Sequence, residues 1–218
     1  MNKMKVEIWS DVMCPFCYIG KKRFDTALEK FPHKDEVDVE WKSYQLNPHL
    51  TTQADKNINE YLAEHKGISI EEARSLNEHV TAMAAEVGLT YKMDEAVVAN
   101  SFMAHRMTHF AKTKGKQSEL EELLFKSYFT EGKNIDDLDT LLQIGEEIGL
   151  DKNELKSVLE SNQFAEDVQK DVYEAHQVGL KGVPFFVYNN QYGISGAQPK
   201  ELFEQTLQQA YDEWKKET

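Results

Sequence analysis

Cysteine is scarce in this sequence, with only two among 218 residues. A disulfide framework of the kind that stabilises small secreted domains is therefore excluded. Long apolar stretches are also missing, since none approaches the roughly 18 residues of a membrane-spanning helix. Residues 1–9 alternate charged residues with Val and Ile and lack the continuous apolar core of a signal peptide. We expect a cytoplasmic protein.

Positive charge is in short supply as well. The chain has 25 Lys and Arg against 38 Asp and Glu, a formal net charge of −13. Nucleic acids and anionic membrane surfaces bind basic faces, and these lysines form no cluster. With 40% hydrophobic residues the chain can still bury a sizeable core. The composition predicts a soluble globular protein that binds neither nucleic acid nor membrane.

Strand patterns occur only near the two ends of the chain. Residues 5–9 and 37–45 alternate polar and apolar side chains, and a helical pattern lies between them. Residues 185–188 and 191–195 flank Asn189-Asn190 as in a β-hairpin, and Pro199 suits the first turn of a final helix. The two ends therefore predict a βαβ unit and a ββα unit.

The middle of the chain, residues 51–179, has apolar residues three and four apart and predicts roughly six helices. Ser69 with Glu72 and Asp151 with Glu154 fit N-terminal capping boxes. Acidic pairs such as Glu121-Glu122 are interpreted as solvated helix faces. The predicted fold class is α/β, with a large all-helical domain inserted between two halves of a smaller fold.

The two cysteines, Cys14 and Cys17, lie in a Cys-Pro-Phe-Cys segment between the first strand and the first helix. Pro15 suits the first helical turn, which places Cys14 at the helix N-terminus, where negative charge is stabilised. We expect Cys14 to be exposed and to act as the nucleophile. Cys17, one turn further along, is expected to be buried, protonated and able to attack a mixed disulfide at Cys14.

A metal site is the competing interpretation. Zinc would need two further ligands, and no second Cys-x-x-Cys is present. His105 and His109 are four residues apart, but Arg106 stands where a His-Glu-x-x-His site needs its glutamate. We expect no metal and no bound cofactor beyond the cysteine pair itself.

The whole chain resembles the DsbA family of the thioredoxin superfamily, most closely its FrnE-like branch. The resemblance rests on five segments: Trp9 to Lys21 around the cysteines, Gln45-Leu46-Asn47-Pro48, Ala104-His105-Arg106, Val183-Pro184-Phe185-Phe186-Val187, and Gly193 to Pro199. It implies a discontinuous thioredoxin-like domain, residues 1–50 and 180–218, around an inserted helical domain, residues 51–179.

The resemblance also implies roles for individual residues. Pro184 is expected to be cis and to pack beside the Cys14 sulfur, and the Val183 backbone to pair with an extended substrate segment. Pro15 and Phe16, between the cysteines, are expected to contact substrate. Asn100, His105 and Arg106 are further candidates, on a helix that would face the active-site groove.

Phe16 departs from the pattern of strongly oxidising family members, many of which have His at this position. A phenyl ring cannot donate a hydrogen bond to the Cys14 thiolate, so we expect a less oxidising pair. Phe16 also adds apolar surface beside the sulfur, which favours unfolded or hydrophobic protein clients.

These features predict a cytoplasmic thiol:disulfide oxidoreductase whose partners are disulfide-containing or unfolded proteins, with a small thiol or a thioredoxin-type protein as redox partner. Two alternatives remain open. One is a glutathione-type isomerase or transferase that acts on small molecules and needs a single nucleophile. The other is a non-enzymatic adaptor that docks through the helical domain.

Overall fold

The computed structural model describes residues 3–217, in which a mixed four-stranded sheet is assembled from both ends of the chain. The strand order is β2-β1-β3-β4. β1 pairs in parallel with β2, and β3 pairs antiparallel with both β1 and β4. The strands have the following bounds: β1 Met4–Ser10, β2 Val37–Ser43, β3 Phe185–Tyr188 and β4 Tyr192–Ser195.

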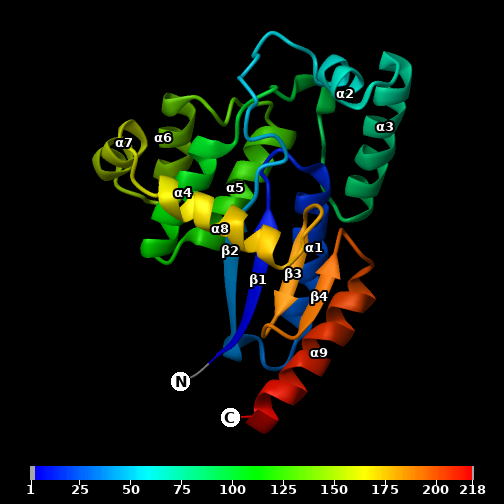
Figure 1. Ribbon diagram of the computed structural model, residues 1–218, viewed down its shortest axis with the longest axis vertical. Coiled ribbons are helices and arrows are strands. Elements are labelled where there is room, and N and C mark those ends of the chain that lie inside the picture. Colours follow the sequence, from blue (N-terminus) through cyan, green and yellow to red (C-terminus); the bar gives the residue numbers. More distant parts are fainter. Residues whose placement is uncertain (1–2, 218) are drawn as a thin grey trace.

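Helices cover both faces of this sheet (Figure 1). On one face α1 packs against α9, and on the other α8 lies across β1 and β2. The helices of the two ends are α1 Pro15–Lys30 and α9 Lys200–Glu217. Since side chains alternate along a strand, Ile8 joins the core on the α1 side while Trp9 packs with Ala175 of α8.

The insertion between β2 and β3 is helical, as predicted. Residues 51–179, all of which the structure describes, form seven α-helices where the sequence predicted roughly six. Their bounds are α2 Ile58–Lys66, α3 Ile70–Glu86, α4 Phe102–Thr113, α5 Gln117–Phe129, α6 Leu138–Glu147, α7 Lys152–Glu160 and α8 Ala165–Gln177. A short 3-10 turn at Met93–Glu95 also lies in the insertion, and another at Lys34–Glu36 precedes β2.

Local sequence signals explain several boundaries. Ser69 and Glu72 form the predicted capping box at the start of α3. Asp151 caps α7 by accepting from the Asn153 and Glu154 amides, but the Glu154 carboxylate pairs with Lys114 instead of closing a box. The Asn189-Asn190 turn has both residues at positive φ, as a two-residue hairpin requires.

A buried ion-pair cluster fixes α8 to the sheet. Asp171 of α8 accepts a hydrogen bond from the Ser43 amide at 2.8 Å, and its carboxylate lies 3.1 Å from His109 Nε2 and 3.2 Å from Lys42 Nζ. Burial alone would raise the pKa of Asp171, but His109, the Ser43 amide and Lys42 together hold it below its usual value. The surroundings of Asp171 in the folded protein therefore stabilise its ionised carboxylate.

Acid should weaken this attachment. Because the pKa of Asp171 is lower in the folded chain, its contribution to stability is complete above the unfolded value and is lost as pH falls through the folded one. We expect Asp171→Asn to lower the free energy of unfolding by about 2 kcal/mol near neutral pH and by clearly less near pH 3. Denaturant titrations at both pH values measure this. Asp167→Asn, an exposed change on the same helix, should have little effect at either.

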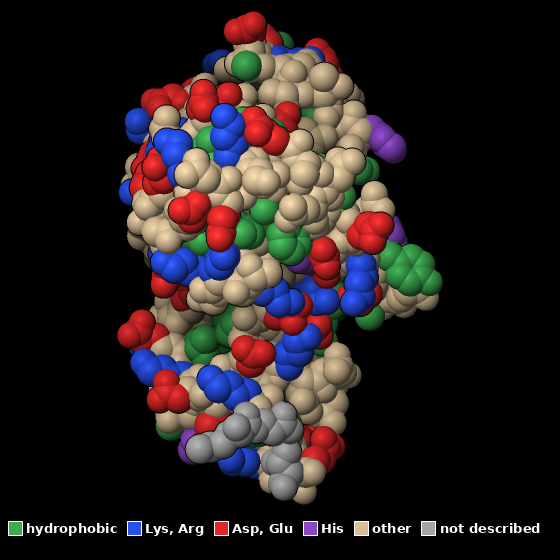
Figure 2. All heavy atoms as spheres, turned by 90° about the vertical axis from the view of Figure 1, so that its left-hand side faces the viewer, with side chains coloured by type: hydrophobic (Ala, Val, Ile, Leu, Met, Phe, Trp, Pro, Cys, Tyr) green, Lys and Arg blue, Asp and Glu red, His purple; other side chains and the backbone are tan. Residues whose placement is uncertain are grey.

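Charged side chains of both signs are interspersed over the face shown in Figure 2, with no extended basic patch. Within residues 3–217, no helix combines the length and the apolar character needed to cross a bilayer.

Candidate active site

The cysteine pair lies where β1 passes into α1. Cys14 is the N-cap residue of α1 and Pro15 its first residue, as predicted. A tight turn precedes the helix, because the Cys14 amide donates to the Asp11 carbonyl at 2.9 Å. The Cys17 amide donates to the Cys14 carbonyl at 3.0 Å, which places the residues one turn apart. Both cysteines are free thiols.

The residues before β3 face Cys14 from the other end of the chain. The Val183–Pro184 peptide bond is cis, and Cys14 Sγ lies 3.5 Å from the Val183 carbonyl oxygen. Gly20 of α1 makes room for the proline, since a Cβ atom there would lie 2.9 Å from Pro184 Cγ. Glycine at position 20 thus lets Pro184 pack directly on the helix that carries the cysteines.

The expectation that Cys14 is exposed is wrong, because only 4% of the residue is accessible. The Val183–Pro184 turn lies over the Cys14 sulfur. Tyr91 lies against the cysteine motif, since its hydroxyl donates to the Pro15 carbonyl at 2.7 Å. Phe16, by contrast, is 42% exposed. The surface presented at the motif is therefore the Phe16 ring.

Cys17 is buried, as expected. Burial raises its pKa well above the ordinary value, and the neighbouring Cys14 raises it further. Two groups oppose this rise, the Asp11 backbone N–H and the Ser10 hydroxyl, both of which favour a Cys17 thiolate. Ser10 Oγ is buried without another hydrogen-bond partner among the described residues. Cys17 therefore holds its proton at rest but has donors beside it for the charged form.

Asp11 holds the cysteine loop in shape. Its carboxylate accepts from the Met13 amide at 3.2 Å and from the Leu46 amide at 2.7 Å. The second bond ties the loop to the segment that follows β2. The same carboxylate lies 3.6 Å from His105 Nε2, which comes from α4 of the insertion.

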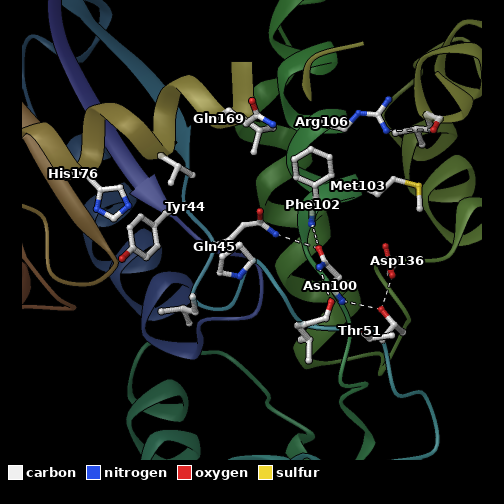
Figure 3. A pocket seen from close by; sticks show the side chains of 17 residues that line it. Tyr44, Gln45, Thr51, Asn100, Phe102, Met103, Arg106, Asp136, Gln169 and His176 are labelled. Carbon is white, nitrogen blue, oxygen red and sulfur yellow. Dashed lines mark hydrogen bonds between the residues drawn. The ribbon is translucent and has the colours of Figure 1, made fainter. Parts of the chain in front are cut away.

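The three candidate groove contacts occupy different places (Figure 3). Asn100 and Arg106 line a cavity of about 990 Å³ between α4, α8 and the segment after β2. Their polar atoms are engaged within the protein: Asn100 bonds Gln45, the Leu50 carbonyl and the Phe102 amide, and Arg106 bonds backbone carbonyls at the C-terminal end of α7 and in the turn after it. His105 does not reach the cavity, because its ring is buried beside Asp11.

Two residues at the site were not predicted from the sequence. Tyr91 gave no signal, because it lies in an irregular segment of the insertion. Glu121 was wrongly interpreted as solvated, since it is buried in α5. Its position gave a usable signal: Gln117, Leu120, Glu121 and Leu124 share the buried face of that helix. A carboxylate in such a stripe indicates a buried polar contact.

The described histidines and carboxylates near the site do not form a group of metal ligands. Among residues 3–217, no three His, Cys, Asp or Glu side chains are grouped so that they could hold a metal ion. His105 faces Asp11, and His109 faces Asp171 and Ser43. The two histidines therefore lie beside two different carboxylates, Asp11 and Asp171.

Comparisons with known proteins agree with this geometry. The chain is 30% identical to the uncharacterized protein YwbO of Bacillus subtilis (strain 168) over 217 residues, covering 97% of this chain and 98% of that one. The crystal structure of the probable DsbA oxidoreductase SCO1869 from Streptomyces coelicolor superimposes with a TM-score of 0.90 at 38% identity, covering 96% of this chain and 91% of that one.

A more distant structure shares the fold. The cytosolic disulfide reductase DsbM of Pseudomonas aeruginosa superimposes with a TM-score of 0.66 at 14% identity, covering 95% of this chain and 98% of that one. Residues 5–208 match the family described as the DSBA-like thioredoxin domain. The chain therefore belongs to the DsbA-like thioredoxin family of thiol oxidoreductases, with the cysteine pair Cys14 and Cys17 at the start of its first helix.

Proposed function

We propose that the protein is a cytoplasmic thiol:disulfide oxidoreductase that exchanges disulfides with protein clients. The observation that carries this proposal is the position of the cysteine pair at the N-terminus of α1, with the Val183 carbonyl oxygen 3.5 Å from Cys14 Sγ. A thiolate at a helix N-terminus is stabilised by the helix dipole, and an extended client segment can pair with the Val183 backbone.

The exchange needs two steps. Cys14 Sγ as thiolate attacks a client disulfide, forms a mixed disulfide, and one client sulfur leaves with the electron pair and takes up a proton. Cys17 then loses its proton and attacks Cys14 Sγ, which forms the Cys14–Cys17 disulfide and releases the second client thiol. The client is reduced by two electrons and the pair is oxidised. The same steps in reverse introduce a disulfide into a client.

The surroundings of Cys14 favour apolar polypeptides as clients. Phe16 and Leu46 are both exposed, at 42% and 50%, although their side chains are large and apolar. The Leu46 amide donates to the Asp11 carboxylate, which ties the segment that carries Leu46 to the cysteine loop. No bound cofactor enters this scheme, and an external small thiol or a thioredoxin-type protein would reset the pair.

The cavity beside Leu46 favours a second candidate, a thiol-dependent reaction on a small molecule. Its volume of about 990 Å³ is sufficient for a drug-sized ligand. The presence of Cys17 argues against this candidate, because such a reaction requires only one nucleophile and would leave the buried second thiol without a role.

The redox equilibrium of the pair tests the proposal. The protein is equilibrated across graded thiol/disulfide buffers, free thiols are alkylated, and the mass shift is read. We expect one reversible two-electron transition, closer to the roughly −270 mV of thioredoxin than to the roughly −120 mV of a strong oxidant, because Phe16 cannot donate to the thiolate. Thiols that do not form a Cys14–Cys17 disulfide in any buffer would contradict the proposal.

A further inference from the structure

Cys17 must lose its proton before it can resolve a mixed disulfide, yet its surroundings oppose that loss. The sulfur is buried, and burial raises its pKa. The face of β1 towards α1 carries Val6 and Ile8 below Ser10, so the strand supplies no ionisable side chain beneath the thiol. Any charge that assists Cys17 must come from elsewhere in the fold.

The insertion supplies such a group. His105 of α4 is 2% exposed, and its Nε2 lies 3.6 Å from Asp11 Oδ1, with no hydrogen-bond partner among the described residues. Asp11 is the residue whose backbone N–H favours the Cys17 thiolate. Asp11 therefore has a backbone N–H that favours the Cys17 thiolate and a carboxylate that lies 3.6 Å from His105 Nε2.

Three acidic groups face His105 from three different elements. Asp11 comes from the cysteine loop, Glu121 from α5 and Asp171 from α8. Burial disfavours a charged imidazole, but these groups outweigh it and raise the pKa of His105. Burial in turn raises the pKa of Glu121, and His105, the Thr108 hydroxyl, Lys21 and His109 oppose that rise.

Two tyrosines complete the surroundings of the cysteine loop. Tyr91 packs beside both cysteines, and Tyr128 of α5 lies near Asp11 with its buried hydroxyl unpaired among the described residues. Burial raises the pKa of each, so both stay neutral and add no charge. His105 is thus the group in these surroundings that can place a positive charge next to Asp11.

We propose that His105 is a positioning residue that holds a positive charge behind the cysteine loop and thereby promotes loss of the Cys17 proton in the resolving step. This proposal rests on the proposed function. In the balanced step the Cys17 proton is released, Cys17 Sγ bonds to Cys14 Sγ, and the bond from Cys14 Sγ to the client sulfur breaks. The client sulfur keeps the electron pair and takes up a proton. Without the imidazolium, only the Met13 and Leu46 amides would offset the negative charge of the Asp11 carboxylate, and this charge beside the loop disfavours a second negative charge on Cys17.

A chromogenic mixed disulfide tests this directly. Cys14 is labelled in acid with one equivalent of 5,5′-dithiobis(2-nitrobenzoic acid), and release of the second thionitrobenzoate is followed after jumps to between about pH 5 and pH 9. We expect His105→Gln to shift the pH dependence of the release rate to higher pH by about one unit. Release near pH 7 would then be about tenfold slower than in the wild type. The variant and wild-type rates should converge at high pH, where His105 in the wild type has lost its proton and no longer assists Cys17. A merely distorted site would stay slow throughout.

His109→Gln is the matched control, because His109 lies one turn along the same helix and faces Asp171 instead of Asp11. Its release profile should follow that of the wild type. A His105→Gln profile that also follows the wild type would overturn the inference while leaving the proposed function intact. If the wild-type protein itself releases no second thionitrobenzoate, the proposed function fails.

A second measurement does not depend on how the variant folds. Isotope-labelled histidine in the wild-type protein reports the protonation of each ring by NMR. We expect the His105 ring to carry two N–H protons near pH 7. A neutral His105 ring at that pH would overturn the inference.

Discussion

A Cys17→Ala variant is expected to hold its clients as mixed disulfides on Cys14 and to lose at least about 100-fold in disulfide turnover. Cys14 keeps its place at the N-terminus of α1, so the first attack proceeds. The sulfur that completes the exchange is missing, and release then depends on an external thiol. Non-reducing gels with mass spectrometry of the adducts, and a protein-disulfide reduction assay, measure the two effects.

Cys14→Ala provides the matched control, since it should form no adducts at all while changing an equally small side chain. The same pair of variants separates the alternative functions. A thiol transferase acting on small molecules, or an adaptor, would keep its activity in Cys17→Ala. Unchanged turnover in that variant would therefore contradict the two-cysteine mechanism.

An Arg106→Ala variant is expected to lose about 3 kcal/mol or more of unfolding free energy. The guanidinium of this buried residue donates to four backbone carbonyls, those of Val158, Leu159, Ser161 and Gln163. These carbonyls lie at the C-terminal end of α7 and in the turn that leads to α8. Alanine would remove these donors and leave the Val158 carbonyl with only its bonds from Ser161, and buried acceptors that lose partners are costly.

Urea titration of the Arg106→Ala variant measures this loss. Arg74→Ala, at an exposed position of α3, should change the unfolding free energy little. Arg106→Lys keeps the charge but has one donor group for four acceptors, so we expect an intermediate value. Wild-type stability in Arg106→Ala would show that water satisfies these carbonyls. Because Arg106 lines the cavity, a change in client capture at equal stability would point to a further role there.

The fold class could be predicted from the sequence because it depends on local patterns. The alternation in residues 5–9, the proline after Cys14 and the Asn189-Asn190 turn each specify a local backbone geometry. The helix count was less reliable: residues 51–179 contain one helix more than predicted, since short helices joined by brief turns merge in a pattern of period 3.6.

The surroundings of the site could not be predicted because they depend on contacts between distant residues. Cys14 was expected to be exposed, but residues 91 and 183 lie against its segment, far along the chain. His105 and His109 were recognised as a pair on one helix, yet their partners are Asp11, which precedes the insertion, and Asp171, which lies in its last helix. Spacing identifies a shared helix face but not what packs on it.

The order in which the strands are made has a consequence for the newly synthesised chain. β1, the cysteine loop and β2 emerge from the ribosome first, and β1 can pair with β2 without delay. β3 pairs with β1 only after the whole insertion has been translated, so the contact is highly non-local. Until then the Val183–Pro184 turn that covers Cys14 does not exist. An unfinished chain therefore lacks the turn that lies over Cys14 Sγ, and this sulfur gains its cover only when the C-terminal segment has folded.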